Sequence, residues 1–228
     1  HTLTLITIEF AAAAHLMMSL VLFFFARRRV SFLSQAWIML LISLMYCAAL
    51  FYVYTQEIPA LGILHPVLLI YLLACSFLQS IYPLGLCMPG YLQWGRMWTY
   101  ASPALILISL YAGGALAGSD MIKVYDASDF REYLLSGDVI LRIAALGLSI
   151  YYIVNIFRLP HRLTRQVELP RWMITYGVAL GAVSLFFVII TLSFNRLGVI
   201  IYILLFTLVN MFLFFRILEP VFNALPHP

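Results

Sequence analysis

Long apolar runs recur along the whole sequence, and they constrain the fold more than any other feature. Each run extends over about 20 residues, the length that an α-helix needs to cross the hydrocarbon core of a bilayer. Inside lipid the backbone must satisfy its own hydrogen bonds, so a spanning segment is either a helix or part of a closed barrel. The runs are continuous rather than alternating, which favours helices. We therefore predict an all-α, polytopic membrane protein.

The composition supports this class and excludes others. Of the 228 residues, 64% are hydrophobic and 10% are charged, whereas soluble domains carry about 25% charged residues. The net charge of +4 comes from basic residues in short loops, not from the clustered basic face that direct nucleic-acid contact needs. The cysteines Cys47, Cys75 and Cys87 all lie inside apolar runs and are expected to be small apolar fillers.

The boundaries of the apolar runs predict seven transmembrane helices in one bundle, residues 1–218. The predicted spans are Leu3–Phe25, Phe32–Tyr54, Pro66–Leu86, Trp98–Gly118, Val139–Phe157, Trp172–Phe194 and Leu197–Phe215. We expect the last run to break at Pro220, because proline disrupts a helix interior. Residues 219–228 would then form a cytoplasmic tail, the start of a linker to a further domain.

Loop charges predict the orientation. The first, third and fifth loops carry eight basic residues and the other three loops carry three. Basic residues favour the cytoplasmic side, so the N-terminus is predicted outside and the C-terminus inside. The eight are Arg27, Arg28, Arg29, Arg96, Arg158, Arg162, Arg165 and Arg171, and the three are Lys123, Arg131 and Arg196.

The external loop of residues 119–138 is the longest connection. Asp126 or Ser128 is placed to cap a short helix that carries Phe130, Tyr133 and Leu134 on one side. Such a segment is either a lid over the bundle or a helix lying on the membrane surface. Both alternatives stay open from the sequence.

Ionisable residues inside a span are costly and mark candidate functional sites. Glu9 and Arg142 both fall in the outer half of their spans. A pair between them would line an outward-facing pocket. The alternatives are that Arg142 pairs with Asp138, four residues earlier, or extends to the interface.

Other polar residues inside the spans have two interpretations. His15 near the midplane is either a proton or ligand site or a residue hydrogen-bonded to a neighbouring helix. Gln79, Asn155 and Asn210 are typical of interhelical hydrogen bonds.

No cofactor or metal is expected, and no catalytic motif is present, so the chain is not predicted to be an enzyme. His15 is the only histidine well inside a span, whereas a membrane dihaem site needs pairs. The zinc spacing H-E-x-x-H is absent. Lys123, the only lysine, lies in a loop and cannot hold retinal in the last helix.

Two short motifs accompany this topology, FFFARRR after the first span and FRILEP at the end of the last. With them, the stretch from Leu3 to Glu219 resembles the N-terminal seven-helix sensor domains of bacterial membrane-bound signalling proteins. In that family the last helix leads to a histidine kinase, a cyclic-nucleotide enzyme or an AraC-type helix-turn-helix DNA-binding domain. The resemblance implies a signal-transduction module of the bacterial inner membrane, with an output domain for signalling or transcription regulation beyond this chain.

We therefore expect a receptor that senses a small molecule, a lipid or the membrane state and signals through its last helix. The candidate ligand contacts are Glu9, Arg142, Tyr71, Gln79 and His15. Receptors of this type often dimerise, so a homodimer is a candidate assembly. The alternatives are a small-solute transporter and an accessory membrane subunit. The polar residues are concentrated in the outer half and midplane, which favours a blind pocket over a channel.

Overall fold

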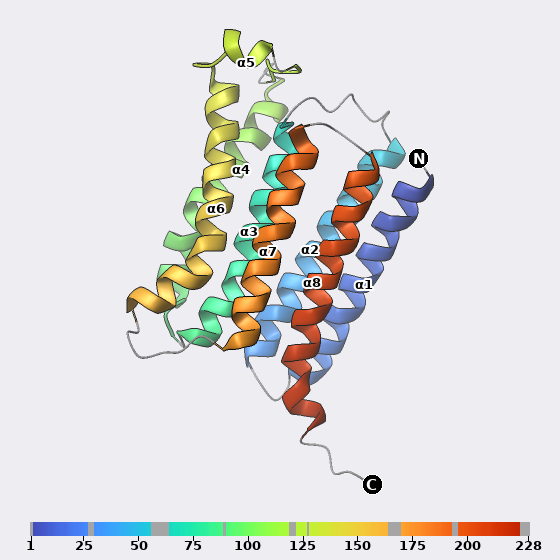
Figure 1. Cartoon of the computed structure of the whole chain (residues 1–228), viewed down its shortest axis with the longest axis vertical. Coiled ribbons are helices and arrows are strands. Elements are labelled where there is room, and N and C mark those ends of the chain that lie inside the picture. The colour runs from blue at the N-terminus through green and yellow to red at the C-terminus, as the bar shows by residue number, and fades with distance from the viewer. Residues whose placement is uncertain are drawn as a thin grey trace. The chain divides into compact units, whose positions relative to one another are not determined.

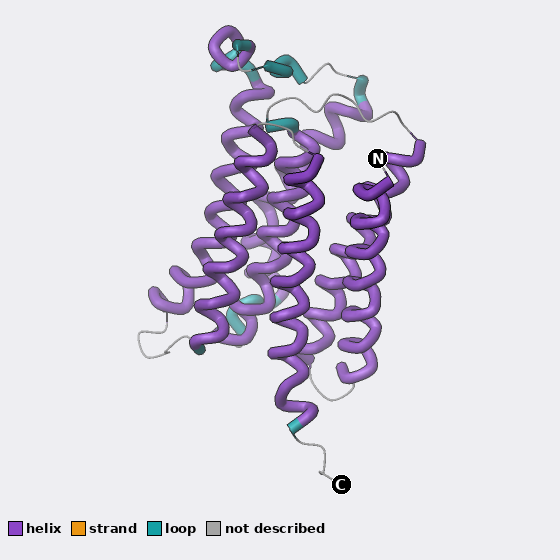
Figure 2. Tube along the Cα trace, turned by 45° about the vertical axis from the view of Figure 1, so that its right-hand side comes forward, coloured by secondary structure: helices purple, strands orange, loops and turns teal. Residues whose placement is uncertain are grey.

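The computed structural model describes residues 2–26, 30–55, 64–88, 90–118, 122–126, 128–163, 170–192 and 196–223. In these residues the regular structure is helical, and no strand occurs among them (Figure 2). The helices, labelled in Figure 1, are α1 (Thr2–Ala26), α2 (Val30–Thr55), α3 (Pro66–Cys87), α4 (Trp94–Leu116), α5 (Asp129–Glu132), α6 (Gly137–Leu163), α7 (Arg171–Leu192) and α8 (Arg196–Phe222). The all-α class is confirmed.

Within the described residues, six helices are long and apolar enough to cross a membrane, namely α1, α2, α3, α6, α7 and α8. These fit a multi-pass membrane protein. The predicted span Trp98–Gly118 corresponds to α4, which is not among the six. Its first turns carry Arg96, Thr99, Ser102 and Pro103, which dilute the apolar residues. The seventh crossing stays a prediction.

Two predicted spans end more than one residue before the corresponding helices do. α6 continues through Pro160 to Leu163 instead of ending at Phe157. α8 continues through Pro220 to Phe222, so the expected break at Pro220 is wrong. A proline removes only its own N–H from the helix, and the N–H of Asn223 still donates to the Glu219 carbonyl at 3.1 Å. The helical hydrogen bonds do not require apolar side chains, so both helices extend into polar sequence.

The described chain divides into two compact units. Unit 1 comprises His1–Glu57, Glu168–Val183 and Arg196–Pro228, and unit 2 comprises Ile58–Val167 and Ser184–Asn195. The first part of α7 therefore belongs to unit 1 and its last part to unit 2.

Unit 1 is built around α1, which packs against α2 and α8. Small buried residues allow α1 and α2 to approach closely. The hydroxyl of Ser19 donates to the Ala36 carbonyl and that of Ser43 donates to the Ala12 carbonyl, both at 2.8 Å. These two bonds, from opposite helices, fix the antiparallel register of the pair.

Unit 2 contains α3, α4 and α6, which lie side by side (Figure 1). Its core is apolar and aromatic, with Leu69, Leu73, Leu84, Met88, Tyr100, Ala104, Leu107, Ala145 and Tyr152 in one cluster. The Tyr152 hydroxyl donates to the Tyr100 carbonyl at 2.8 Å, and the hydroxyls of Tyr100 and Ser80 are 2.7 Å apart. These bonds satisfy buried polar groups and tie the three helices together.

Candidate functional site

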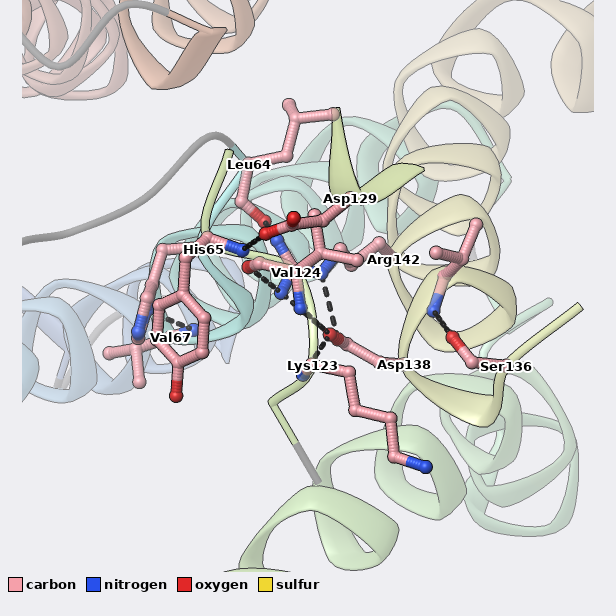
Figure 3. A network of polar contacts seen from close by, with 11 residues as sticks. Leu64, His65, Val67, Lys123, Val124, Asp129, Ser136, Asp138 and Arg142 are labelled. Atoms are coloured by element: carbon pink, nitrogen blue, oxygen red, sulfur yellow. Dashed lines mark hydrogen bonds and ion pairs between the residues drawn. The ribbon is translucent and has the colours of Figure 1, made fainter. Parts of the chain in front are cut away.

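The first turns of α6 hold a buried ion pair. Arg142 Nε donates to Asp138 Oδ1 at 2.7 Å, and Nη2 donates to Oδ2 at 2.8 Å (Figure 3). The side chains are 1% and 0% exposed. A bidentate pair at this spacing of one helical turn is strong and directional. Of the alternatives that the sequence left open for Arg142, the structure shows the pair with Asp138.

The same two side chains hold the loop of residues 119–138. Asp138 Oδ2 accepts the backbone N–H groups of Lys123 at 2.8 Å and Val124 at 3.1 Å. Arg142 Nη2 donates to the Val124 carbonyl at 2.9 Å. Val124 is fully buried, so this part of the loop is fastened onto the start of α6 (Figure 3).

The segment before α3 is held by the same arginine. Arg142 Nη1 donates to the Leu64 carbonyl at 3.1 Å, and the Leu64 N–H donates to the Thr191 carbonyl at 2.7 Å. Leu64 has a φ of +52°, a left-handed conformation that is uncommon for a leucine. Leu64 thus connects the start of α3 to both α6 and the end of α7, all within unit 2.

His65 caps α3. Its Nδ1 accepts the N–H of Val67 at 3.3 Å, and Pro66 occupies the first helical position, where a missing N–H costs nothing. Burial lowers the pKa of His65 from its ordinary value, and the nearby positive charge of Arg142 lowers it further. Asp138 acts in the opposite direction but is outweighed. The imidazole is therefore held neutral beside the ion pair.

The short helix α5 lies next to the arginine. The guanidinium carbon of Arg142 is 5.9 Å from the centre of the Phe130 ring, within the range of a cation–π contact. Ser128, one of the two predicted caps, occupies the N-cap position of α5, but its side chain makes no capping bond. Asp129 instead accepts the N–H groups of Tyr125 and Asp126, and these bonds lower the pKa of Asp129. The side-chain bonds at this turn thus come from the carboxylate of Asp129, which accepts from the residues before the helix.

Tyr111 of α4 is a further polar residue beside the ion pair of Asp138 and Arg142. It is near enough to Asp138 and Arg142 to interact with both charges. Its hydroxyl is buried and has no hydrogen-bond partner among the described residues. Arg142 makes at least four hydrogen bonds, and a guanidinium has five N–H groups to donate. Within the described residues, the Tyr111 hydroxyl is therefore a group of this site with unused hydrogen-bonding capacity.

Glu9 has a different environment in unit 1. It lies on an exposed face of α1, and the Tyr54 hydroxyl donates to its Oε1 at 2.9 Å. Glu9 belongs to unit 1 and Arg142 to unit 2, and each has a partner in its own unit.

His15 is fully buried in unit 1. Its Nδ1 is 2.7 Å from the Ala11 carbonyl, and its ring lies 5.5 Å from that of Tyr46 and 6.1 Å from that of Phe206. Nε2 has no hydrogen-bond partner among the described residues. The contacts come from α1, α2 and α8, so His15 sits at the centre of this helix group.

Tyr71 and Gln79 both lie on α3 in unit 2. The Tyr71 ring is 6.0 Å from that of Phe187 in the unit 2 part of α7. Gln79 is 1% exposed. The five predicted ligand residues are therefore divided, with Glu9 and His15 in unit 1 and the other three in unit 2.

Leu64, His65, Val124 and Tyr54 were not singled out from the sequence. Leu64 and Val124 accept hydrogen bonds from Arg142 through their backbone carbonyls. Every residue has such a carbonyl, so the residue type gives no indication of this role. His65 could have been found, since it directly precedes a proline that starts a helix. No group of three or more His, Cys, Asp or Glu side chains within the described ranges is arranged to hold a metal ion.

Comparison of the chain with protein-family models, with curated proteins and with solved structures gives no match.

Proposed function

We propose that the chain is a sensor module of the bacterial inner membrane with seven spans, its N-terminus outside and its C-terminus in the cytoplasm. It responds to a small ligand or to the membrane state and signals through α8 to a cytoplasmic output domain. It carries no catalysis of its own.

Seven crossings are supported by the helix directions in unit 2. Arg142 in the second turn of α6 bonds to Leu64, just before α3, so both helices begin at the same end of the unit. α3 runs away from that end, and the chain must return before α6 starts. α4 has 23 residues, about 35 Å of helix, which is long enough for this return crossing.

The observation that carries the sensor proposal is the fastened loop over the buried ion pair. Asp138 and Arg142 hold Val124 and Leu64, and Tyr111, whose hydroxyl has no partner among the described residues, lies near both charges. A ligand that bonds to Tyr111 and competes for these contacts would favour a second packing of the loop. A ligand acts only through such a difference in affinity.

α7 and α8 could transmit a change in the packing of the loop toward the cytoplasmic end of α8. Thr191 in the last turn of α7 accepts the Leu64 N–H, and the first part of α7 belongs to unit 1 with α8. The end of α8 carries the exposed pair Arg216–Glu219. This polar, helical end is suited to continue into a partner domain or a second copy of the chain.

The test uses the full chain with a fluorophore on Asn223→Cys, in a background without native cysteines. Tyr111→Phe should change the probe's response to a small-molecule library, whereas the exposed Thr99→Ala should not. Flux of amino acids or sugars across proteoliposomes, without any probe response, would instead favour the transporter alternative. The intact mass of the native gene product, compared with the 26.0 kDa of this chain, tests for a fused output domain.

A further inference from the structure

Glu9 is a carboxylate on an apolar, exposed helix face. Its neighbours on α1, Leu3, Ile6 and Phe10, are all more than half exposed. Among the described residues, Glu9 forms no ion pair, and its hydrogen-bond partner is the neutral hydroxyl of Tyr54. A carboxylate at the edge of a bilayer without a cation is costly, so this position calls for a cationic partner.

The depth of Glu9 follows from Tyr54. The apolar window of α2 ends at Phe51, and Tyr54 lies three residues further on, about 4.5 Å along the axis. Tyrosine is enriched at this level, where membrane and water meet. The hydrogen bond of 2.9 Å joins the carboxylate of Glu9 to the hydroxyl of Tyr54, so the carboxylate lies within one tyrosine side chain of that level. Lipid headgroups occupy this zone.

The rest of the face suits a lipid molecule. Phe51 and Phe10, near this pair in the sequence, are exposed aromatic residues that can contact a cation through their ring faces. Leu16 and Leu20 follow Glu9 by seven and eleven residues, so they share its helix face within about 20°. Both are exposed. An acyl chain can therefore follow this face of α1 while the headgroup stays at Glu9.

We propose that Glu9 and Tyr54 bind the primary ammonium group of a phospholipid headgroup. An ammonium has three N–H donors. Glu9 Oε2 and the lone pairs of the Tyr54 oxygen can accept from it while Tyr54 keeps its bond to Oε1. The carboxylate supplies the opposite charge, and the apolar face below selects a lipid rather than a soluble amine. This site does not depend on the sensor proposal.

The purified full chain, exchanged into nanodiscs of equal parts phosphatidylethanolamine and phosphatidylglycerol with identical acyl chains, provides the test. Native mass spectrometry after release counts the lipids that stay bound. Wild type should retain phosphatidylethanolamine preferentially. Glu9→Gln should lower that preference about tenfold, the order expected for losing a hydrogen bond to a charged group. Tyr54→Phe should lower it by a smaller factor.

Glu219→Gln is the matched control, because Glu219 is also an exposed carboxylate on a helix but already pairs with Arg216. This variant should retain the wild-type preference. An equal preference in wild type and Glu9→Gln, with both giving the same helical circular dichroism, would overturn the proposal. So would displacement of the bound lipid by millimolar free ethanolamine, because the site would then select a soluble amine.

Discussion

Arg142 makes several contacts that hold unit 2 together. It neutralises Asp138, holds the Leu64 and Val124 carbonyls and lies beside the Phe130 ring. A buried charge is stable only with such partners, since desolvation is expensive. The pair therefore fastens the loop, and beside it the buried Tyr111 hydroxyl has no hydrogen-bond partner among the described residues.

Breaking this pair should destabilise the protein strongly. Arg142→Gln leaves the Asp138 carboxylate buried without its cation, and we expect a loss of about 3–5 kcal/mol in the free energy of unfolding. Denaturant unfolding in micelles would measure it. Arg216→Gln breaks the exposed pair with Glu219 and should cost at most about 1 kcal/mol. Equal losses in the two variants would refute the assignment of Arg142 as a buried fastener.

His65 should make stability depend on pH. Its pKa in the folded protein is lowered, so the unfolded chain, with a histidine pKa of about 6.5, binds the proton more readily. The stabilisation is present above about pH 6.5 and is lost as the pH falls through the lowered value. Melting temperatures from pH 7.5 to pH 4.5 should show this decline.

His65→Asn keeps an acceptor for the N-cap of α3 but cannot titrate, so its decline over this range should be smaller. His161→Asn removes an exposed histidine in the last turn of α6 and serves as the control, with a wild-type decline expected. A decline in His65→Asn that matches wild type would assign the effect to another group.

Part of the site could be predicted from the sequence. The pair of Asp138 and Arg142 was predictable as one alternative, because residues four apart on a helix are neighbours. The bond from Arg142 to Leu64 was not, since it joins residues 78 apart through a backbone carbonyl. Tyr54 as the partner of Glu9 was missed for a similar reason, because it depends on the register of two helices.

At the scale of elements, continuous apolar runs predicted the helices well. The predicted start at Pro66 is confirmed, because proline fits the first helical position and cannot sit deeper without cost. The ends of α6 and α8 were missed, since hydropathy marks the edge of the membrane and not the end of a helix. A sequence with apolar residues on all sides of a helix also carries little information on which faces meet.

The packing of α1 in unit 1 gives a test at this scale. Ala11 is fully buried, whereas Ala13 is exposed on the same helix. Ala11→Leu adds volume to a close-packed helix face and should cost about 1–3 kcal/mol of unfolding free energy. Ala13→Leu should be nearly neutral. A similar loss in both variants would argue against this packing of α1.

At the scale of the whole molecule, labelling with a membrane-impermeant maleimide tests the proposed topology. In a variant without native cysteines, Tyr125→Cys should be labelled in intact cells, because residues 119–138 are proposed to face outward. Gln93→Cys and Asn223→Cys should be labelled only after the cells are opened. Labelling of both Gln93→Cys and Tyr125→Cys in intact cells would place the two ends of α4 on the same side, which excludes α4 as a crossing helix and removes the seven-span proposal. Labelling of Gln93→Cys without Tyr125→Cys would instead reverse the proposed orientation.

The division into two units was not predicted from the sequence, which indicated one bundle of residues 1–218. α7 contributes residues up to Val183 to unit 1 and residues from Ser184 to unit 2, and no composition change marks this point. Only the contacts among helices reveal it.

The contacts of Leu64 also determine the order in which unit 2 can be assembled during synthesis. Its carbonyl must wait for Arg142, and its N–H must wait for Thr191, so α3 enters the bilayer long before either partner has been translated. Asp138 and Arg142, in contrast, leave the ribosome within the same helical turn and can enter the insertion machinery as an already neutralised pair. Final closure of unit 2 is therefore a late, non-local step, and such steps are slow. A nascent chain stalled before α7 should be sensitive to membrane proteases.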